Sequence, residues 1–435
     1  MQIIRTLLAV TLLALPLPAF AAVEVQEITS PGGVDAWLVE EHSIPFVALE
    51  IRFRGGSALD APGKRGAINL MTGLLEEGAG DLDARAFAQA TEALAARFRY
   101  RVFDDVLAIS ASMLTENREA ATALLKSSIM EPRFDQEAID RVREQVLAGI
   151  RSSATDPSSI AGDAFYLSAF GDHPYGQDKS GTIESVSALT RDDIVDAFGR
   201  VFALDRIYVS AVGDITAAEL GALLDTLLGD LPETAAPLAP RAEYGLTGEV
   251  EVIPFDTPQS VALFGHQGIT RDDPDYMAAY VANEILGGSG FEARLMTEVR
   301  EKRGLTYGVS SFLSPMEYNE LILGSVRSDN TKIAEAIEII HAEWAKMAET
   351  GVTADELEDA KTYLTGAYAL RFDGNAPIAR IMVGMQMSDL PVDYIRTRND
   401  ELNALTLEEV NRVAARIYDP EALHFVVVGQ PVGLE

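Results

Sequence analysis

The stretch LTRDDIVDAFGRVFALDRIYVSAVGD at residues 189–214 decides the fold, because its pattern returns without a gap in LTLEEVNRVAARIYDPEALHFVVVGQ at residues 405–430. Each copy opens with Leu-Thr, continues with an acidic pair and an amphipathic segment, and closes with an apolar segment that ends near a glycine. A threonine before acidic residues is typical of a helix N-cap, and a short apolar run is typical of a buried strand. Each copy therefore predicts a capped helix that leads into a buried strand.

A second pair of segments repeats at nearly the same distance. FDQEAIDRVREQVLAGI begins at Phe134, and VTADELEDAKTYLTGAY begins at Val352. The two pairs have offsets of 216 and 218 residues, which indicates a duplicated domain and not a short-period solenoid. In each copy, strand-like segments come first and helical segments follow. We therefore predict an α+β fold of two homologous domains, each with helices packed on one face of its sheet.

The N-terminal sequence MQIIRTLLAVTLLALPLPAFAAVEV is typical of a secretory signal peptide. Arg5 precedes an apolar run, and small residues surround a cleavage position after Ala21. Pro16 and Pro18 interrupt the run, and a membrane anchor needs about 20 apolar residues. We predict that residues 1–21 are removed and that the chain is exported, most simply to the periplasm, without a stable membrane anchor.

The remaining length of about 414 residues is too great for one hydrophobic core and suits two domains of roughly 200 residues each. The segment LPETAAPLAPRAEYGLTGE, residues 231–249, is rich in Pro and Ala and has few large apolar side chains. It is predicted to be a linker. The predicted domains are therefore residues 22–230 and residues 250–435.

The chain is strongly acidic, with 67 Asp and Glu against 35 Lys and Arg and a net charge of −32. This balance argues against nucleic acid as a partner, because phosphate backbones bind basic surfaces. It fits a well-solvated surface, and the alternative is attraction to cationic ligands. The absence of cysteine excludes both a disulfide framework and a lipid-attachment thiol.

Three segments carry a resemblance to a known family. They are RFRGGSALDAPGKRGAINLMTGLLEEGAG at residues 52–80, HPYGQDKSGTIESVSALTRDDI at residues 173–194 and GGSGFEARLMTEVREKRGLTYGV at residues 287–309. Together they resemble the pitrilysin or insulinase-like zinc peptidases, peptidase family M16. The resemblance implies two domains, each with a mostly antiparallel sheet. It also implies that two such chains close like a clam shell around an unfolded peptide.

Active members of this family carry an HxxEH motif on their first long helix and a further glutamate downstream. Histidines four residues apart share a helix face and bind one Zn²⁺, while the glutamate between them acts as general base. Aligning the motif by its flanking glycines puts Asn69 and Gly73 at the histidine positions and Thr72 at the glutamate position. The downstream glutamate falls near Ala148 or Gly149. We therefore expect no metal and no cofactor in this chain, with zinc held by a partner subunit.

The histidines offer no obvious replacement site. They are His42, His173, His266, His341 and His424, and no two form an HxH or HxxxH pair. A zinc site assembled from distant histidines is one alternative. We favour the other, in which they are solvated or hydrogen-bonded.

The second half keeps a pair of residues that the resemblance makes functional. An arginine and a tyrosine seven residues apart reach toward the facing metal site in the family and bind the substrate carbonyl, and these positions match Arg300 and Tyr307. We expect a helix over residues 292–302, Gly304 as its cap and Tyr307 at the start of the next strand. A guanidinium and a phenol hydroxyl can both donate to an oxyanion. The alternative is structural: Arg300 favoured by a helix C-terminus and Tyr307 half-buried in a strand.

The GGSG segment of the second half is a further candidate. By resemblance, Gly287, Gly288 and Gly290 form a glycine-rich loop that contacts substrate, and the alternative is a turn between helices.

These observations predict the metal-free subunit of a heterodimeric M16-type peptidase that acts in the periplasm. The predicted partner is an HxxEH-containing subunit that holds zinc, and the substrate is a peptide. The chain would then be active only within the complex. One alternative is a non-enzymatic scaffold or peptide-binding homologue, and another is a self-sufficient peptidase with an unusual metal site.

Overall fold

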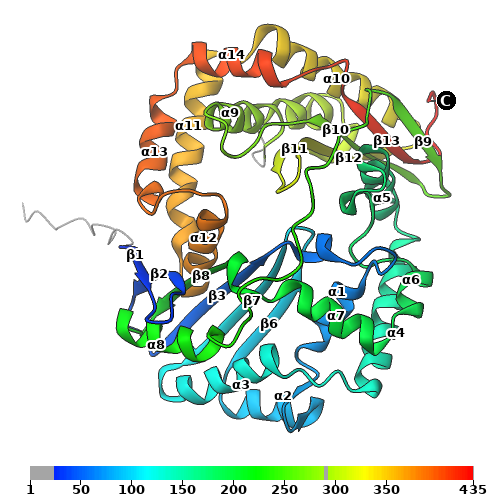
Figure 1. The fold of residues 1–435 in the computed structure, drawn as a ribbon. Helices are drawn as coiled ribbons and strands as arrows, with labels where there is room; N and C mark the ends of the chain where they lie inside the picture. The colour runs from blue at the N-terminus through cyan, green and yellow to red at the C-terminus, as the bar shows by residue number, and fades with distance from the viewer. Residues whose placement is uncertain (1–23, 289–291, 435) are drawn as a thin grey trace, which may run out of the picture.

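The computed structural model describes residues 24–288 and 292–434, which form two halves of similar construction, with the second half above the first in the view of Figure 1. The predicted signal peptide, residues 1–21, and Gly290 lie outside these ranges. Each half contains one large sheet and several helices, and the segment between the last helix of the first half and the first strand of the second has neither. The domain boundaries predicted from the sequence remain predictions.

The first half contains a six-stranded sheet in the order β1-β2-β8-β3-β7-β6. Its strands are β1 (Gln26–Thr29), β2 (Asp35–Glu40), β3 (Phe46–Arg54), β6 (Arg97–Val102), β7 (Val106–Leu114) and β8 (Ile207–Gly213), and β4 (Gly78–Ala79) pairs separately with β5 (Leu82–Asp83). Its α-helices are α1 (Ala67–Leu74), α2 (Ala84–Ala93), α3 (Arg118–Met130), α4 (Gln136–Ser153), α5 (Pro157–Phe170), α6 (Ile183–Ala188), α7 (Arg191–Val201) and α8 (Ala217–Leu228). The short 3-10 helices are η1 (Gly56–Leu59), η2 (Thr115–Asn117), η3 (Pro174–Gly176) and η4 (Leu204–Arg206).

The second half contains a five-stranded sheet in the order β11-β12-β10-β13-β9. Its strands are β9 (Val250–Pro254), β10 (Gln259–Gln267), β11 (Thr306–Pro315), β12 (Glu320–Asp329) and β13 (His424–Gly429). Its helices are α9 (Tyr276–Gly287), η5 (Met296–Glu301), α10 (Ile333–Thr350), α11 (Ala354–Ala369), η6 (Leu370–Phe372), α12 (Asn375–Met387), α13 (Tyr394–Ala404) and α14 (Leu407–Ile417). In each sheet one pair is parallel, β2 with β8 and β13 with β9, and the other pairs are antiparallel. The predicted α+β duplication with mostly antiparallel sheets is confirmed.

The repeated stretch has the same local structure in both halves. Thr190 begins α7 and Thr406 begins α14, and each threonine hydroxyl accepts a hydrogen bond from the backbone N–H three residues later. The carboxylates of Asp193 and Glu409 accept the backbone N–H of these threonines in return, at 2.8 Å in both copies. Each helix is followed by a central strand, β8 or β13. The predicted capped helix and buried strand are therefore correct in both copies, because capping depends on residues close in sequence.

Each sheet also receives a helix from the opposite half. Helix α5 of the first half packs on β10 and β13, while α12 of the second half packs on β3 and β8 (Figure 1). The exchange includes polar contacts: Ser210 Oγ of β8 donates to the Ala379 carbonyl at 2.6 Å, and Gln386 Nε2 donates to the Val209 carbonyl at 2.8 Å. The helices of each half cover one face of its sheet, as predicted. The second face is covered by a helix from the other half, which the sequence analysis did not foresee.

A polar junction also joins the halves, between the turn that connects β6 to β7 and the turn that connects β11 to β12. Tyr175 donates its hydroxyl hydrogen to Asp105 Oδ1 at 2.5 Å and accepts the Tyr318 N–H at 3.0 Å. The Glu317 N–H donates to Asp105 Oδ2 at 3.1 Å. Burial raises the pKa of Asp105 to about 6, while the Tyr175 hydroxyl acts in the opposite direction. The two halves are therefore held together by a partly buried carboxylate whose charge depends on pH.

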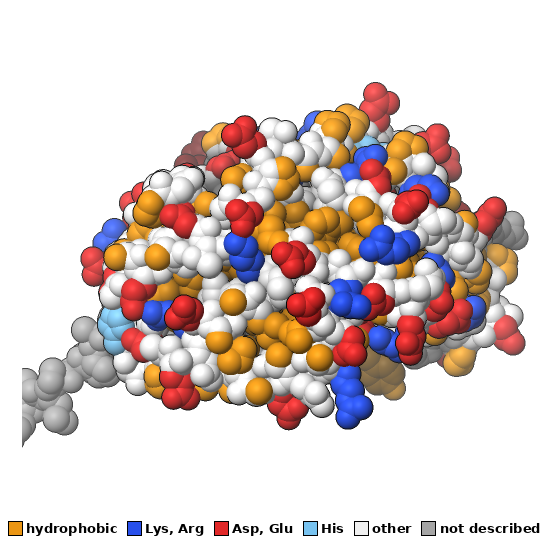
Figure 2. Space-filling model, turned by 60° about the horizontal axis from the view of Figure 1, so that its bottom comes forward, with side chains coloured by type: hydrophobic (Ala, Val, Ile, Leu, Met, Phe, Trp, Pro, Cys, Tyr) orange, Lys and Arg blue, Asp and Glu red, His pale blue; other side chains and the backbone are white. Residues whose placement is uncertain are grey.

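One face of the molecule shows how its charged side chains are distributed (Figure 2). On the face in Figure 2, Asp and Glu side chains lie interspersed with Lys and Arg and with exposed hydrophobic side chains, and neither sign forms one continuous block. Among the described residues, no helix has the length and apolar character that a membrane crossing requires.

Titration of Asp105 at this junction should make the free energy of unfolding depend on pH, and Asp105→Asn should remove this contribution. The folded-state pKa of about 6 lies above the ordinary value of 3.8, so the folded protein binds this proton more tightly than the unfolded chain. The resulting stabilisation is complete below about pH 4 and is lost as the pH rises to about 6, an effect of about 3 kcal/mol. Urea denaturation between these pH values should show the variant gaining about 3 kcal/mol relative to the unmodified protein.

Tyr175→Phe provides the companion measurement. Without the hydroxyl that stabilises the carboxylate, the pKa of Asp105 should rise further, and the loss of stability should extend to higher pH. A difference between Asp105→Asn and the unmodified protein that stays constant with pH would contradict this account.

Candidate functional site

Helix α1 carries the three positions that align with the family's metal motif, and an aspartate fixes its start. The N-cap position is Gly66, which has no side chain to cap the helix. Instead, Asp60 accepts the N–H groups of Gly66 at 2.9 Å and Ile68 at 2.8 Å. Burial raises the pKa of Asp60 to about 6, although both N–H donors favour its charged form. The start of α1 is thus set by a carboxylate from the preceding loop.

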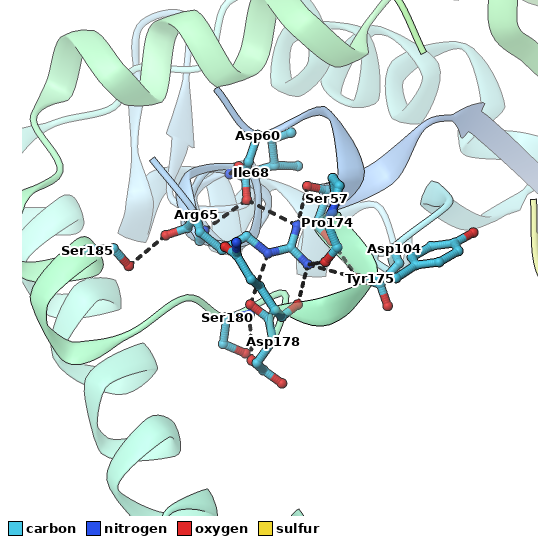
Figure 3. Close-up of polar contacts among 12 residues, drawn as sticks. Ser57, Asp60, Arg65, Ile68, Asp104, Pro174, Tyr175, Asp178, Ser180 and Ser185 are labelled. Atoms are coloured by element: carbon cyan, nitrogen blue, oxygen red, sulfur yellow. Dashed lines mark hydrogen bonds and ion pairs between the residues drawn. The ribbon is translucent and has the colours of Figure 1, made fainter. Parts of the chain in front are cut away.

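Arg65, the residue before this cap, anchors the helix to the HPYGQD segment that follows α5 (Figure 3). Its guanidinium is almost fully buried and donates to main-chain carbonyls and one carboxylate. The acceptors are the carbonyls of Ser57 at 2.6 Å, Gln177 at 2.7 Å, Pro174 at 3.0 Å and Asp178 at 3.1 Å, and Asp104 Oδ1 at 3.1 Å. A buried guanidinium with this many acceptors is well satisfied. The network holds α1 rigidly in place, whatever the chemistry on its surface.

Two of the three aligned positions on α1, Thr72 and Gly73, serve packing. The Thr72 hydroxyl is buried and donates to the Ile68 carbonyl at 2.7 Å, so its proton is used within the helix. A Cβ atom at Gly73 would lie 3.0 Å from Val142 Cγ1, because α4 packs closely against α1 at this point. Asn69 is partly exposed. A histidine at position 73 would require Val142 to move.

A hollow of about 480 Å³ lies beside these positions. It is bounded by Asn69, Thr72 and Gly73 of α1, by Val142, Gln145 and Val146 of α4, and by Tyr100, Arg101, Val102 and Phe103 in and just after β6. Ala148 and Gly149, where the sequence alignment placed the downstream glutamate, are not among these residues. The sequence analysis also missed Gln145 and Arg101. Nothing in the local sequence marks either residue, and only the packing of β6 and α4 around α1 brings them to the hollow.

No metal centre is formed by the part of the chain that the structure describes, where no three His, Cys, Asp or Glu side chains are grouped as ligands. Four histidines have hydrogen-bond partners within the protein: His42 with Asp214, His173 with the Pro240 carbonyl, His266 with Trp344 and His424 with the Glu249 N–H. His266 is buried, and it uses both ring nitrogens because it accepts from Trp344 Nε1 at 2.8 Å and contacts the Gln267 carbonyl at 2.7 Å. These contacts fit the hydrogen-bonded interpretation.

Arg300 lies in the second half, in the helix η5, which is wound as a π-helix. The Lys302 N–H donates to the Thr297 carbonyl, five residues earlier, at 3.0 Å. The helix ends at Glu301, and Gly304 lies just beyond it, with a left-handed φ of +62° and an N–H that donates to the Arg300 carbonyl at 2.8 Å. The glycine cap agrees with the sequence expectation, whereas the π-winding was not predicted. Single turns of π-helix are frequent at functional sites.

Tyr307 lies at a β-bulge at the start of β11. Thr306 pairs with Ser328 and Val309 with Val326, so Tyr307 and Gly308 together oppose one residue of β12. The Thr306 side chain fixes this irregularity: its hydroxyl lies 2.6 Å from the Arg327 carbonyl and accepts the Gly308 N–H at 3.0 Å. The bulge leaves Tyr307 89% exposed. The alternative of a half-buried strand residue is therefore wrong, and a bulge is a known way to redirect a side chain.

Arg300 and Tyr307 belong to elements that pack against each other, η5 and β11. Helix α1 belongs to the other half (Figure 1). Whether Arg300 and Tyr307 are used in function remains a prediction. For Arg300, the alternative of a cation near a helix C-terminus also stays open, because it occupies the last turn of η5.

The predicted substrate-binding glycines can be placed in part. Gly287 is the last residue of α9, and a Cβ atom there would overlap Ser311 of β11. Gly288 is the C-cap of α9, and Gly290 lies outside the described residues. A close approach of α9 to β11 thus explains Gly287 structurally, and contact with substrate remains a prediction.

Two family models match the chain. One is described as insulinase, peptidase family M16, and matches residues 36–182, and the other is described as the peptidase M16 inactive domain and matches residues 188–364. The chain belongs to peptidase family M16. Much of its second half matches the model described as the inactive domain of this family.

Individual relatives extend over nearly the whole chain. The non-peptidase homolog YmxG of Helicobacter pylori is 28% identical over 393 residues, which cover 89% of this chain and 90% of the relative. An uncharacterized zinc protease of Streptomyces coelicolor is 28% identical over 404 residues, with 90% and 86% covered. The crystal structure of a peptidase M16 inactive domain from Pseudomonas fluorescens superimposes with a TM-score of 0.88 at 28% identity, covering 94% of this chain and 99% of that one. A chain from complex III2 of Candida albicans shares the fold, with a TM-score of 0.76 at 15% identity and coverage of 94% and 96%.

The close packing of α1 on α4 predicts that a metal ligand cannot simply be restored. Gly73→His should lower the free energy of unfolding by about 1–3 kcal/mol, because its side chain would overpack against Val142. Adding Val142→Ala should recover part of this loss. Chemical denaturation of both variants measures the effect.

Gly149→Ala in α4 is the matched control. A Cβ atom there meets no other atom within 4 Å, so helix propensity alone should stabilise the protein by roughly 0.5–1 kcal/mol. If Gly73→His left the free energy of unfolding unchanged, the position would not be closed by packing.

Proposed function

We propose that this chain is the metal-free subunit of a heterodimeric M16-type zinc peptidase. In this proposal a partner chain with an HxxEH motif supplies the zinc ion and the general base. This chain supplies Arg300, Tyr307 and half of the enclosure around an unfolded peptide. The predicted signal peptide supports a periplasmic location for the complex.

The exposed Tyr307 is the observation that carries the proposal. A tyrosine that is 89% exposed contributes little to the core, yet its bulge is held by hydrogen bonds from the Thr306 side chain. The neighbouring Arg300 lies in a π-turn, a second departure from regular structure within a few residues. Local irregularity of this kind is characteristic of functional sites.

The chemistry of the pair suits a subunit that has no metal of its own. Peptide hydrolysis at a zinc ion develops negative charge on the carbonyl oxygen. A guanidinium and a phenol hydroxyl are both donors to such an oxygen, and neither competes for the zinc ion. The emptied positions on α1 and the Arg/Tyr pair therefore fit a division of labour between two chains.

Reconstitution with the HxxEH-bearing chain tests the pair. Tyr307→Phe and Arg300→Ala should each lower the kcat of the mixed complex by about 10²–10³-fold, the cost of removing one oxyanion donor. Zinc content and assembly should not change. Peptide cleavage, metal analysis and size-exclusion chromatography measure these three quantities.

Arg303→Ala is the matched control, because Arg303 follows η5 closely but is paired with Glu298 at 2.7 Å. It should leave kcat within a factor of about two, since a surface ion pair contributes little. A complex whose cleavage rate is insensitive to both Arg300→Ala and Tyr307→Phe would exclude the proposed role of the pair.

A non-enzymatic scaffold or peptide-binding protein is the second candidate. The relative from Helicobacter pylori is named a non-peptidase homolog, and a chain of complex III2 has the same fold. Purification from the native periplasm separates the two candidates. An HxxEH-bearing chain of similar size that copurifies in equal amount supports the peptidase subunit, and a homodimer or monomer with unchanged biological activity in Tyr307→Phe supports the scaffold.

A further inference from the structure

A hollow of about 610 Å³ opens between α9, α11, α12 and α13 in the second half. Four arginines line it: Arg271, Arg371, Arg380 and Arg398. No Asp or Glu is among the described residues that line it, although acids outnumber bases almost two to one in the whole chain. We call this hollow the arginine pocket.

Arg398 is the most buried of the four arginines, at 5% exposure. Its guanidinium stacks on Tyr368, 4.4 Å from the ring centroid, and lies 5.8 Å from that of Tyr280. Its hydrogen bonds go to uncharged oxygens, at 2.9 Å to Asn399 Oδ1 and 3.3 Å to the Leu364 carbonyl. A buried cation without a carboxylate is costly, and an anion in the pocket would reduce that cost.

Arg271 has a similar environment on another wall. Its guanidinium lies 4.2 Å from the ring centroid of Tyr276 and 5.6 Å from that of Tyr394, and it donates to the Tyr394 hydroxyl at 3.1 Å. The tyrosines hold the two guanidinium groups in fixed planes. They also give the pocket flat aromatic walls.

The remaining two arginines, Arg371 and Arg380, are exposed. The carboxylate nearest to Arg380 is Glu50, 4.0 Å away, and Glu50 is paired more closely with Arg52 at 2.8 Å. By contrast, Arg294 in the same half pairs with Glu356 at 2.7 Å. The arginine pocket thus groups four guanidinium groups, and no Asp or Glu is among the described residues that line it.

We propose that the arginine pocket binds an organic anion, a carboxylate or phosphate attached to a flat, apolar group. Guanidinium groups bind both anions through paired N–H donors, and the tyrosine rings provide stacking surfaces for the apolar part. The volume is that of a small-molecule site. The ligand is either a free small molecule or the C-terminal carboxylate of a peptide. This site is separate from α1 and from Tyr307, and it does not rest on the function proposed above.

Isothermal titration of the full chain with phenyl phosphate tests the proposal. We expect saturable one-to-one binding with a dissociation constant below about 1 mM, and no binding of phenol, which has the same ring without the charge. Benzoylglycyl-phenylalanine, compared with its C-terminal amide and with phenyl phosphate, distinguishes a peptide C-terminus from a free small molecule as the source of the anion. Stronger binding of the free acid peptide than of phenyl phosphate indicates a peptide C-terminus, and the reverse order indicates a free small anion.

Substitutions of the exposed arginines test whether the anion binds in the arginine pocket. Arg371→Gln and Arg380→Gln are exposed changes that should leave the fold intact, and together they should weaken binding by about 10–100-fold. Arg141→Gln, which removes a surface arginine paired with Glu77 in the first half, is the matched control and should not change it. Failure of all the anions to bind below about 10 mM, or equal binding by the double variant, overturns the proposal.

Discussion

The two strands β8 and β13 are largely buried on both faces, and this constraint shapes the molecule. Along β13, Phe425 and Val427 face the helices of the second half, while Val426 and Val428 pack in the cluster that contains Phe165 of α5. A strand buried on both faces needs two covering layers. The helices of each half provide only one, and α5 and α12 provide the other for the opposite half. Each half therefore completes the core of the other, which fixes the relative positions of α1 and β11 by core packing.

Helix α1 is held in place independently of the positions that align with the family's metal motif. Helix α1 is held by Arg65 and Asp60 through contacts that involve no metal position, so its place in the fold does not depend on zinc. Once ligands are not required, small or self-bonded residues at these positions let α4 approach, as Gly73 and Thr72 do. The contacts that hold α1 in place are thus independent of whether its surface residues can bind zinc.

The sequence predicts the features that depend on neighbours along the chain. Thr190 and Thr406 were recognisable as caps because the acidic residue that completes each capping box is three positions away. Gly304 is recognisable because a glycine just after a helical segment is the usual residue for a left-handed cap. The exchange of α5 and α12, the bulge beside Tyr307 and the residues around the α1 hollow depend on contacts between distant segments. The bulge exists because Thr306 reaches the Arg327 carbonyl on the next strand, a contact that no local pattern encodes.

The buried cations of the molecule differ in whether the protein supplies charged or main-chain partners for them. Few Asp and Glu side chains are buried among the described residues, and buried cations such as Arg65 and Arg294 donate hydrogen bonds to carbonyls or carboxylates of the protein. Such groups are structural because their partners are internal. Arg398 is as deeply buried but is surrounded by tyrosines and neutral oxygens. Likewise, Tyr307 is held outward by a bulge whose hydrogen bonds do not involve its own hydroxyl. Arg398 thus has neutral hydrogen-bond acceptors but no ion pair among the described residues, and Tyr307 is held largely exposed, which favours an external ligand in both places.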